Sequence, residues 1–515
     1  QGAMQPPPPE KLFAVNADGS NALTWGQMAV KRNRLAHSLA KRLPANIVSG
    51  AIYSKNSVEW LLCQQACNIM GLRFSPINWH LVADEIAYIV DDCDADVVFF
   101  GVEYAQTVAA IRSRTPKVQL WVCMDGETIG AESLESLVAA APEQAPPPTH
   151  SRQGGMVGYT GGTTGKPKGA VRSNKPQKPE QQMKTLQQWG LLRMMPQPVQ
   201  LVAAPLYHAL PGAWLQIGTV LGTTFVVMAK FDGIKVMAAI EKFKVNGFYM
   251  PPILLKRLMQ LPAKDVASYD RSSVKTIMSG GAKCPANVKQ GICDMFGRVL
   301  HELYGASELG GVAIMDPEHI LEKPQSCGRP AAGIDVIIVD ENRKKITKPN
   351  VSGEIFAKGM NIDGYHKLPD KTEESMLDGY FSVGDVGYID EDGYLYITDR
   401  KIDMIISGGA NIYPAQVEEV LHQHPAVEDV AVFGLADEEY GERVHAALKL
   451  VAGQQVAAKE LLEWCSGKIG KFQLPQEADI SFFSEDFPRT EAGKLRKKVL
   501  KAQVEARKKL PASKL

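Results

Sequence analysis

The residues best suited to chemistry lie in a stretch at positions 159–169, which reads Tyr-Thr-Gly-Gly-Thr-Thr-Gly-Lys-Pro-Lys-Gly. Glycine lets a backbone approach an anion closely and turn its N–H groups toward it, while threonine hydroxyls add uncharged donors. Lys166 and Lys168 can offset part of the charge of a triphosphate. The stretch is not a Walker loop, because position 160 is threonine and Pro167 follows Lys166. Its composition fits a phosphate-binding loop and also a flexible surface loop.

The helices and short strands that would position this loop alternate along the first part of the chain. The spacing of apolar residues predicts helices at 25–43 and 58–70 and strands at 47–53 and 96–101. A second block of the same kind covers about residues 155–320. This alternation favours an α/β fold in which helices cover a largely parallel sheet.

The pattern changes near residue 325. Short apolar strands at 336–340, 353–356 and 394–397 are separated by turn residues. The sequence therefore predicts a small β-rich subdomain at about 325–400.

The last part of the chain returns to a compact mixture of helices and strands. Helices are predicted at 415–423 and 457–464, and strands at 427–432 and 444–450. We expect a large N-terminal domain at 1–400 and a small mobile C-terminal α+β domain at 404–515. A hinge is expected at 400–403.

Length and composition narrow the class of protein. A chain of 515 residues is too long for a single hydrophobic core. Lysine plus arginine and aspartate plus glutamate each number 57, which gives no indication of a nucleic-acid partner. No run of about 18 apolar residues is present, so no membrane span is predicted. The eight cysteines are scattered without a Cys-x-x-Cys pair, which favours free thiols in a reducing compartment.

Further motifs follow the loop in a fixed order along the chain. They are PLYH (205–208), SGGA (279–282), LYGASE (303–308), YFSVGD (380–385), DRKID (399–403), SGGANIYP (407–414) and PRTEAGK (488–494). Together with the loop, this series resembles the adenylate-forming superfamily of acyl-CoA synthetases, adenylation domains of peptide synthetases and beetle luciferases. The resemblance spans nearly the whole chain and is closest to the acyl-CoA synthetases.

This resemblance implies roles for individual residues in the use of ATP. Glu308 would bind Mg²⁺, and Ser307, where the family more often has threonine, would meet the α-phosphate. Asp385 would accept both ribose hydroxyls, and Lys494 would reach the substrate carboxylate and the phosphate. Glu302 stands where the family often has asparagine or glutamine near the adenine amine. The remaining nucleotide contacts would come from Thr160, Gly161, Gly162, Thr163, Thr164, Lys168, Gly280, Gly281, Ala282, Tyr304 and Arg400.

The same resemblance places the acid and the acyl acceptor. His208, Gly212 and Trp214 would wall an acyl pocket, and the channel for the acceptor would be lined by Gly408, Gly409 and Phe472. Two positions depart from the family pattern. Ile402 occupies the place of the usual Asp or Lys pivot, and residues 471–476 carry fewer charges than many coenzyme A-dependent relatives.

The sequence therefore predicts an ATP-dependent ligase that converts a small carboxylic acid to an acyl-adenylate with release of pyrophosphate. ATP, Mg²⁺ and coenzyme A are the expected cofactors and co-substrates, with an acyl thioester as product. An amine or amino acid as acceptor, giving an amide, is the main alternative. A luciferase-like oxidase is more remote. A non-enzymatic scaffold is also remote, because Glu308, Asp385, Arg400 and Lys494 are all present.

The two ends of the chain bear on location. The start, Gln1-Gly-Ala-Met4, is typical of a tag remnant, and Ser513-Lys514-Leu515 matches the peroxisomal import tripeptide. An intracellular, soluble protein is expected. It would be cytoplasmic in a bacterium and would lie in the peroxisomal matrix of a eukaryote. The sequence indicates neither the identity of the acid nor an oligomeric state.

Overall fold

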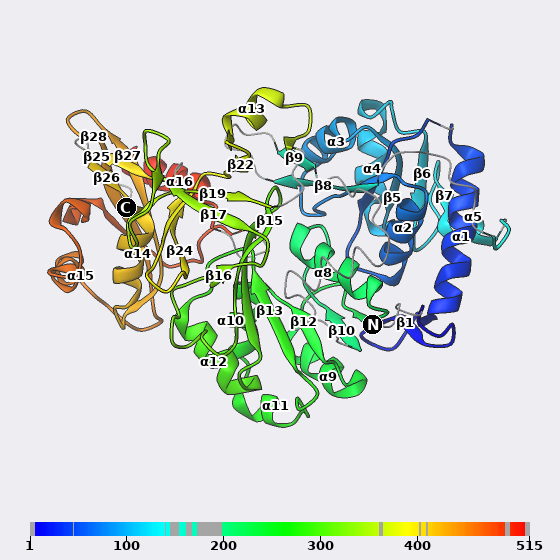
Figure 1. Cartoon of the computed structure of the whole chain (residues 1–515), viewed down its shortest axis with the longest axis horizontal. Coiled ribbons are helices and arrows are strands. Elements are labelled where there is room, and N and C mark those ends of the chain that lie inside the picture. The colour runs from blue at the N-terminus through cyan, green and yellow to red at the C-terminus, as the bar shows by residue number, and fades with distance from the viewer. Residues whose placement is uncertain are drawn as a thin grey trace. The chain divides into compact units, whose positions relative to one another are not determined.

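A computed structural model describes residues 6–44, 46–139, 141–144, 154–160, 167–171, 198–359, 364–400, 403–407, 410–489 and 495–509 (Figure 1). Residue contacts divide the chain into two units, one of Gln1–Asp335 with Ala357–Phe381 and one of Val336–Phe356 with Ser382–Leu515. The fold is mixed α/β, with a large N-terminal sheet domain and a smaller C-terminal domain, which confirms the predicted class. The predicted hinge at 400–403 falls inside the second unit and stays a prediction.

Two large sheets form the first unit. Within the described part of the chain, one has eight strands in the order β20-β9-β8-β4-β3-β5-β6-β7. Strands β8, β4, β3, β5 and β6 are parallel neighbours. The bounds are β3 Ser49–Tyr53, β4 Arg73–Pro76, β5 Ala95–Phe100, β6 Leu120–Cys123, β7 Glu132–Ser133, β8 Gly155–Thr160, β9 Lys168–Val171 and β20 Gly364–Tyr365.

The second sheet of this unit has nine described strands in the order β16-β15-β14-β13-β12-β10-β11-β1-β2. Its central strands β14, β13, β12, β10, β11 and β1 are parallel neighbours. The bounds are β1 Leu12–Asn16, β2 Leu23–Thr24, β10 Val199–Val202, β11 Thr224–Val227, β12 Gly247–Tyr249, β13 Thr276–Gly280, β14 Leu300–Ala306, β15 Gly310–Met315 and β16 Arg329–Pro330.

Helices cover these sheets. Helices α1 and α2 share one core with Phe13 and Phe225 of the nine-stranded sheet and with Phe74 and Phe99 of the eight-stranded sheet, so they lie between the two. Helices α3 and α4 pack on the other face of the eight-stranded sheet (Figure 1). The helices that the structure describes in this unit are α1 Trp25–Arg42, α2 Val58–Ile69, α3 Ala83–Asp92, α4 Ala105–Ile111, α5 Leu134–Ala139, α8 Ala209–Val220, α9 Gly233–Phe243, α10 Pro252–Met259, α11 Ala263–Ala267, α12 Ala286–Phe296 and α13 Pro369–Glu374.

Local sequence explains where the first helices begin. Thr24 accepts a hydrogen bond from the Gln27 backbone, and the Gln27 side chain accepts one from the Thr24 backbone, so α1 starts with a capping box. Ser57 caps α2 with a single hydrogen bond, which its hydroxyl accepts from the Trp60 N–H group. The helices predicted at 25–43 and 58–70 are therefore confirmed to within one residue at each end.

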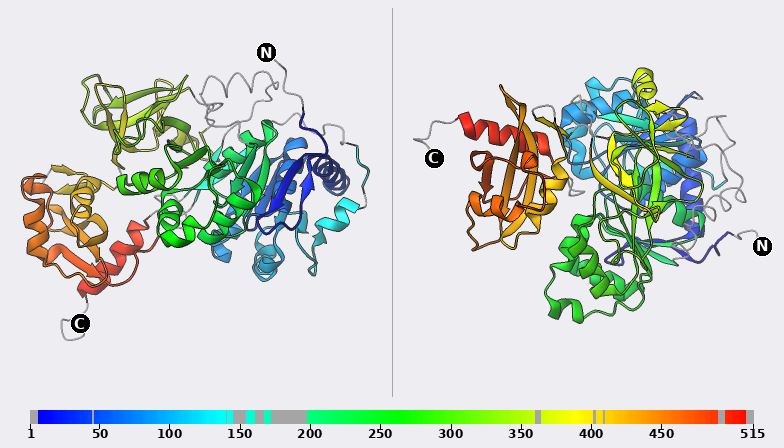
Figure 2. Two further views of the ribbon diagram at one scale, coloured as in Figure 1. Left: turned by 90° about the horizontal axis from the view of Figure 1, so that it is seen from below. Right: turned by 60° about the vertical axis from the view of Figure 1, so that its left-hand side comes forward.

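The second unit is built from smaller sheets. Strand β19 pairs with β23, and β23 pairs with β24. A five-stranded sheet among the described residues has α14 and α15 on one face and α16 on the other. Figure 2 shows the five-stranded sheet and its helices, coloured from yellow-orange to red, from two further sides. The helices are α14 Pro414–His422, α15 Ala458–Cys465 and α16 Lys497–Lys509.

The strands of the β-rich region and of the small domain also match the predicted pattern. The strands expected at 336–340, 353–356, 394–397, 427–432 and 444–450 correspond to β17, β19, β24, β27 and β28. The bounds are β17 Asp335–Val339, β18 Lys345–Ile346, β19 Gly353–Lys358, β21 Met376–Leu377, β22 Tyr380–Phe381, β23 Asp385–Ile389, β24 Leu395–Arg400, β25 Ile405–Ser407, β26 Ala410–Ile412, β27 Val427–Asp437, β28 Gly441–Leu450 and β29 Ile480–Phe483. Among the helices that the structure describes, none is long and apolar enough to cross a membrane.

Candidate functional site

The segments that the motifs single out follow neighbouring strands of the nine-stranded sheet. Residues 205–208 come after β10, and Tyr249 ends β12. Residues 280–282 begin at the last residue of β13, and residues 304–308 cover the end of β14 and the turn after it. These four strands are adjacent and parallel. Their carboxyl ends therefore meet at one edge of the sheet, which is where open α/β sheets bind ligands.

The predicted phosphate loop connects β8 to β9. These strands pair as an antiparallel hairpin in which Thr160 lies opposite Lys168. The Lys168 ammonium lies 5.7 Å from the centre of the Tyr365 ring. Gly161, Gly162, Thr163 and Thr164 fall outside the described residues, as does the side chain of Thr160. Their phosphate contacts therefore stay predictions.

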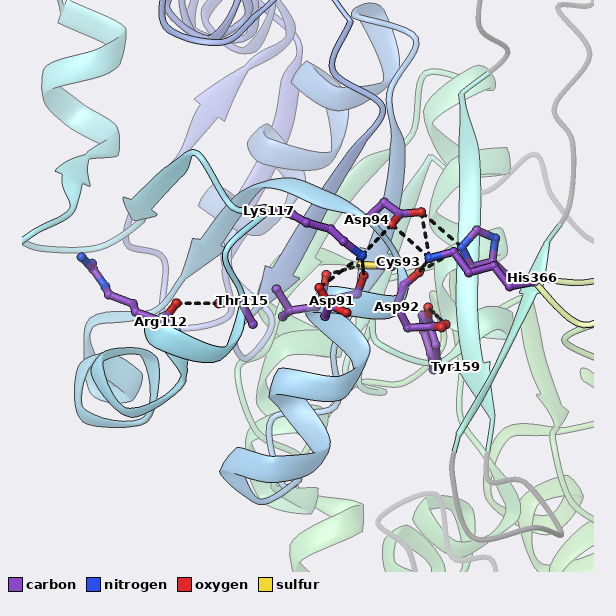
Figure 3. A network of polar contacts seen from close by, with 11 residues as sticks. Asp91, Asp92, Cys93, Asp94, Arg112, Thr115, Lys117, Tyr159 and His366 are labelled. Carbon is purple, nitrogen blue, oxygen red and sulfur yellow. Dashed lines mark hydrogen bonds and ion pairs between the residues drawn. The ribbon is translucent and has the colours of Figure 1, made fainter.

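A hydrogen bond ties the first strand of this hairpin to the end of α3. The Tyr159 hydroxyl donates to Asp92 Oδ2 at 2.7 Å (Figure 3). Burial, together with the nearby Cys93 and Asp92, raises the pKa of the Tyr159 phenol above its ordinary value. The phenol therefore keeps its proton, and β8 is fastened just before the glycine-rich loop begins.

The second strand of the hairpin is fastened by the residues after β20. The His366 backbone N–H donates to the Gly169 carbonyl at 2.8 Å. The Lys117 ammonium lies 3.0 Å from Asp94 Oδ1 (Figure 3). The Lys367 ammonium lies 3.0 Å from the same oxygen. Burial works to raise the pKa of Asp94, but the hydrogen bonds from Lys367 and Lys117 hold it below its ordinary value. Both strands that flank the loop are thus connected to residues at or just after the C-terminal end of α3.

The glycine segment after β13 is closely packed on one side. A Cβ atom on Gly280 would lie 2.5 Å from the Leu303 carbonyl oxygen and 2.9 Å from Leu210 of α8, so only glycine fits there. The Tyr249 hydroxyl donates to the Gly280 carbonyl at 2.9 Å. Gly281 and Ala282 are exposed. The segment therefore presents open backbone at a fixed place on the sheet edge.

A tight turn joins β14 to β15 and carries the predicted metal ligand. Ser307 and Glu308 lie in this turn, and Glu308 is 8% exposed. Tyr304 and Ser307 are half-buried. A Cβ atom on Gly305 would lie 1.9 Å from the carbonyl oxygen of Gly310, so the hairpin needs glycine at this position. The packing of the hairpin thus determines where the Ser307 hydroxyl and the Glu308 carboxylate lie.

Glu302 lies deeper in the same strand. Its side chain is 5% exposed, and its Oε2 atom lies 2.5 Å from the ammonium of Lys289 on α12. Its Oε1 atom accepts a hydrogen bond from the Cys284 backbone N–H at 3.1 Å. Burial raises the pKa of the Glu302 carboxyl above its ordinary value, and the positive charge of Lys289 acts against that rise. One carboxylate oxygen thus accepts a hydrogen bond from the backbone, and the other faces Lys289 in an ion pair.

Two of the three predicted acyl-pocket residues, Gly212 and Trp214, lie on α8, and His208 immediately precedes this helix. His208 is the N-cap of α8, and its ring centre lies 4.4 Å from that of Tyr207. Burial lowers the pKa of His208 to about 4, so its imidazole is neutral at pH 7. Gly212 and Trp214 are buried. Within the described ranges, His208 Nε2 and Trp214 Nε1 are buried without a hydrogen-bond partner.

The remaining predicted residues belong to the second unit. Asp385 begins β23, is buried, and lies opposite Arg400 in the β23–β24 pair. The Arg400 side chain is outside the described part of the structure. Phe472 is 63% exposed and lies in a short 3-10 helix, Lys471–Gln473. The structure does not describe Gly408, Gly409 and Lys494.

Comparison with known families identifies this architecture. A model of the "AMP-binding enzyme" family matches residues 3–366, and a model of the "AMP-binding enzyme C-terminal domain" matches residues 416–494. The chain belongs to the AMP-binding enzyme family. The predicted membership of the adenylate-forming superfamily is thereby confirmed.

Curated relatives of this AMP-binding enzyme include coenzyme A ligases. A "Feruloyl-CoA synthase" of Amycolatopsis sp is 31% identical over 500 residues, which cover 95% of this chain and 94% of the relative. An "Indoleacetate--CoA ligase" of Aromatoleum aromaticum is 32% identical over 481 residues, which cover 92% of each chain. These relatives support the prediction of an enzyme of the acyl-CoA synthetase type.

A solved structure has the same fold over nearly the whole chain. It is the o-succinylbenzoate CoA synthetase (MenE) of Bacillus subtilis in complex with its acyl-adenylate intermediate. The TM-score is 0.79 at 27% identity, and the match covers 96% of both chains. The large sheet domain and the smaller C-terminal domain of this AMP-binding enzyme are therefore those of an adenylate-forming fold.

The structure also places residues that the sequence motifs did not single out. Asp92 accepts the hydrogen bond of Tyr159 although the two residues are 67 positions apart in the sequence, and no local pattern connects them. Lys289, in contrast, could have been found from the sequence. It lies on the apolar stripe of α12 with Ile292 and Cys293, and a lysine at such a position needs a buried partner. Tyr159 and Glu302, which lie in or next to the motifs, are thus held by a hydrogen bond and an ion pair to residues outside them.

Proposed function

We propose that this AMP-binding enzyme is an acyl-CoA synthetase. Its first step joins a carboxylate oxygen of the acid to the α-phosphorus of ATP and expels pyrophosphate. In the second step the thiol of coenzyme A attacks the acyl carbon, and AMP leaves. The observation that carries the proposal is the meeting of residues 205–208, 280–282 and 304–308 at the carboxyl edge of adjacent parallel strands.

The nucleotide would be held by groups of complementary chemistry. Residues 280–282 offer exposed backbone and Tyr304 a ring for the adenine, while Asp385 and Arg400 would bind the ribose and phosphates. The hairpin loop would hold the phosphates through Thr160, Gly161, Gly162, Thr163, Thr164 and Lys168. These assignments rest on the family resemblance and on the fastening of the β8–β9 hairpin.

Mg²⁺ is part of the proposal, with Glu308 as its protein ligand and Ser307 beside the α-phosphate. Across the described residues, no group of three or more His, Cys, Asp or Glu side chains could hold a metal ion by itself. Mg²⁺ is commonly bound by one or two carboxylates together with substrate phosphates. A single buried carboxylate at the sheet edge fits that requirement, and the bound ion would neutralise charge on the phosphates.

The acid would lie against His208, Gly212 and Trp214. A neutral imidazole and an indole ring suit an uncharged, largely apolar acyl group. Two of the relatives are named for aromatic acids, ferulate and indoleacetate. We therefore place aromatic carboxylic acids first among the candidate substrates.

The acceptor and the domain movement complete the proposal. Gly408, Gly409 and Phe472 would line the path of the coenzyme A thiol after the 404–515 domain turns about a hinge at 400–403. An amine acceptor is the second candidate, because residues 471–476 carry little positive charge for the coenzyme A phosphates. The relatives named above are bacterial, which supports a bacterial cytoplasm over a peroxisome.

The test is ATP–pyrophosphate exchange with a panel of carboxylic acids. Wild type is expected to exchange only when its acid is present, and Lys494→Ala to lose about 10²–10³ in rate, as for the loss of a preorganised donor. The variant should still transfer the acyl group from a supplied acyl-adenylate to coenzyme A. Lys498→Ala, an exposed lysine nearby in sequence, is the matched control.

The outcomes separate the candidate functions. Normal exchange in Lys494→Ala would remove the assigned role of this lysine. Pyrophosphate release without any acid would contradict both ligase activities. Mass spectrometry of the products then identifies the acceptor, since an amide without a thioester would replace the coenzyme A proposal by the amine alternative.

A further inference from the structure

A buried ion pair lies beneath the glycine segment of the proposed adenine site. Lys289 on α12 is 1% exposed, and its ammonium lies 2.5 Å from Glu302 Oε2 on β14. The same ammonium donates to the carbonyl oxygens of Pro324 at 2.6 Å and Ser326 at 3.2 Å. Lys289 thus has three oxygen partners and joins α12, β14 and the segment before β16.

Glu302 in turn holds the end of the glycine segment. Its Oε1 atom accepts from the Cys284 backbone N–H at 3.1 Å. At the other end of the segment, the Tyr249 hydroxyl donates to the Gly280 carbonyl at 2.9 Å. Residues 280–284 are therefore held at both ends, and the exposed Gly281 and Ala282 lie between these two anchors.

A direct contact between Glu302 and the adenine amine would break this arrangement. The carboxylate would have to leave Lys289, and a buried ammonium without its counterion is strongly unfavourable. It would also release the Cys284 N–H group, which is buried in the protein. The geometry favours a carboxylate that acts on the nucleotide only through the backbone it holds.

We propose that Glu302 and Lys289 are positioning residues, which hold the backbone of residues 280–284 in the conformation that receives the purine ring of ATP. Glu302 does not touch the base. This inference rests on the proposed function, because it takes residues 280–282 as the adenine-binding segment. It replaces the base contact that the family resemblance implied for Glu302.

Equilibrium ATP binding tests the inference without any acid substrate. Glu302→Gln keeps an oxygen for Cys284 but removes the charge opposite Lys289, and Lys289→Met removes the charge opposite Glu302. Each single variant is expected to raise the Kd for ATP about tenfold, while the double variant returns to within about threefold of wild type, as for a directly coupled pair. Lys275→Met, an exposed lysine just before β13, is the matched control.

Purine riboside triphosphate, which lacks the 6-amino group, distinguishes positioning from base contact. Positioning predicts that both single variants weaken binding of ATP and of this analogue by the same factor. Loss of the preference for ATP in Glu302→Gln, with the preference kept in Lys289→Met, would establish direct contact and overturn the proposal. Additive losses in the double variant would overturn it as well.

Thermal melting of each variant separates loss of binding from loss of folding. If neither single variant folds, the proposal is tested with the double variant alone. A folded double variant that binds ATP more than tenfold more weakly than wild type would contradict the proposal. Glu302→Asp, which keeps the charge but shortens the reach to Cys284, should bind ATP more weakly at unchanged preference over the analogue. Wild type that binds ATP but shows no acid-dependent exchange would refute the synthetase function alone.

Discussion

His445 should make the stability of the small domain depend on pH. It lies on β28, is 0% exposed, and its Nε2 atom is 3.1 Å from the Ser481 hydroxyl. Burial, then the charge of Lys508, lowers the pKa of His445 to about 4, although Asp479 acts in the opposite direction. Protonation of His445 would bury a positive charge near the charges of Lys508 and Arg443. Both of these side chains also lie close to Asp479.

The size of the effect follows from the two pKa values. An unfolded histidine titrates at 6.5 and His445 in the folded domain at about 4. Between these values the unfolded state binds more protons, so stability is complete above 6.5 and is lost as the pH falls toward 4. At about 1.4 kcal/mol per pH unit, the loss amounts to about 3 kcal/mol.

Amide hydrogen exchange measured by mass spectrometry reports this locally. We expect the opening free energy of peptides from β27 and β28, corrected for intrinsic exchange rates, to fall by about 3 kcal/mol between pH 7 and pH 4. His445→Asn should remove most of this slope, whereas His422→Asn, an exposed histidine of the same domain, should keep it. A full slope in His445→Asn would refute the reasoning.

Four further outcomes are expected. Tyr159→Phe, which removes the hydrogen bond to Asp92, should raise the KM for ATP about tenfold in the exchange assay with little change in the KM for the acid. Leu500→Ala, which truncates a fully buried side chain of α16, should cost about 2–5 kcal/mol in guanidinium unfolding, whereas Val499→Ala beside it, 37% exposed, should cost far less. Gly305→Ala places a methyl group 1.9 Å from the Gly310 carbonyl, so exchange activity should fall at least about tenfold through distortion of the β14–β15 turn. The eight cysteines are all buried, so a thiol reagent should label the native protein slowly. After denaturation the same reagent should label eight thiols.

Each of these has a result that would contradict it. Parallel changes in both KM values in Tyr159→Phe would indicate general damage and not hairpin positioning. Equal unfolding costs at positions 499 and 500 would contradict the packing of α16. Wild-type exchange in Gly305→Ala would show that the turn can relax, and rapid native labelling would place a cysteine at the surface.

The sequence alone was sufficient for the secondary-structure pattern and the family. Helical spacing at 25–43 and the strand at 353–356 are local properties, and they appear in the structure as α1 and β19. The glycines and threonines of 159–169 likewise belong to one continuous stretch. Such features need only neighbouring residues, so the order of motifs determined that this chain is an adenylate-forming enzyme.

The tertiary structure decided which groups support the motif residues. Glu302 stands at a position associated with an adenine contact, yet Lys289 and the Cys284 N–H group occupy its carboxylate. Tyr159 meets Asp92 only because strand order brings β8 near the end of α3. These contacts depend on the register of strands and the packing of helices across long sequence separations, and no local pattern of residue types contains that information.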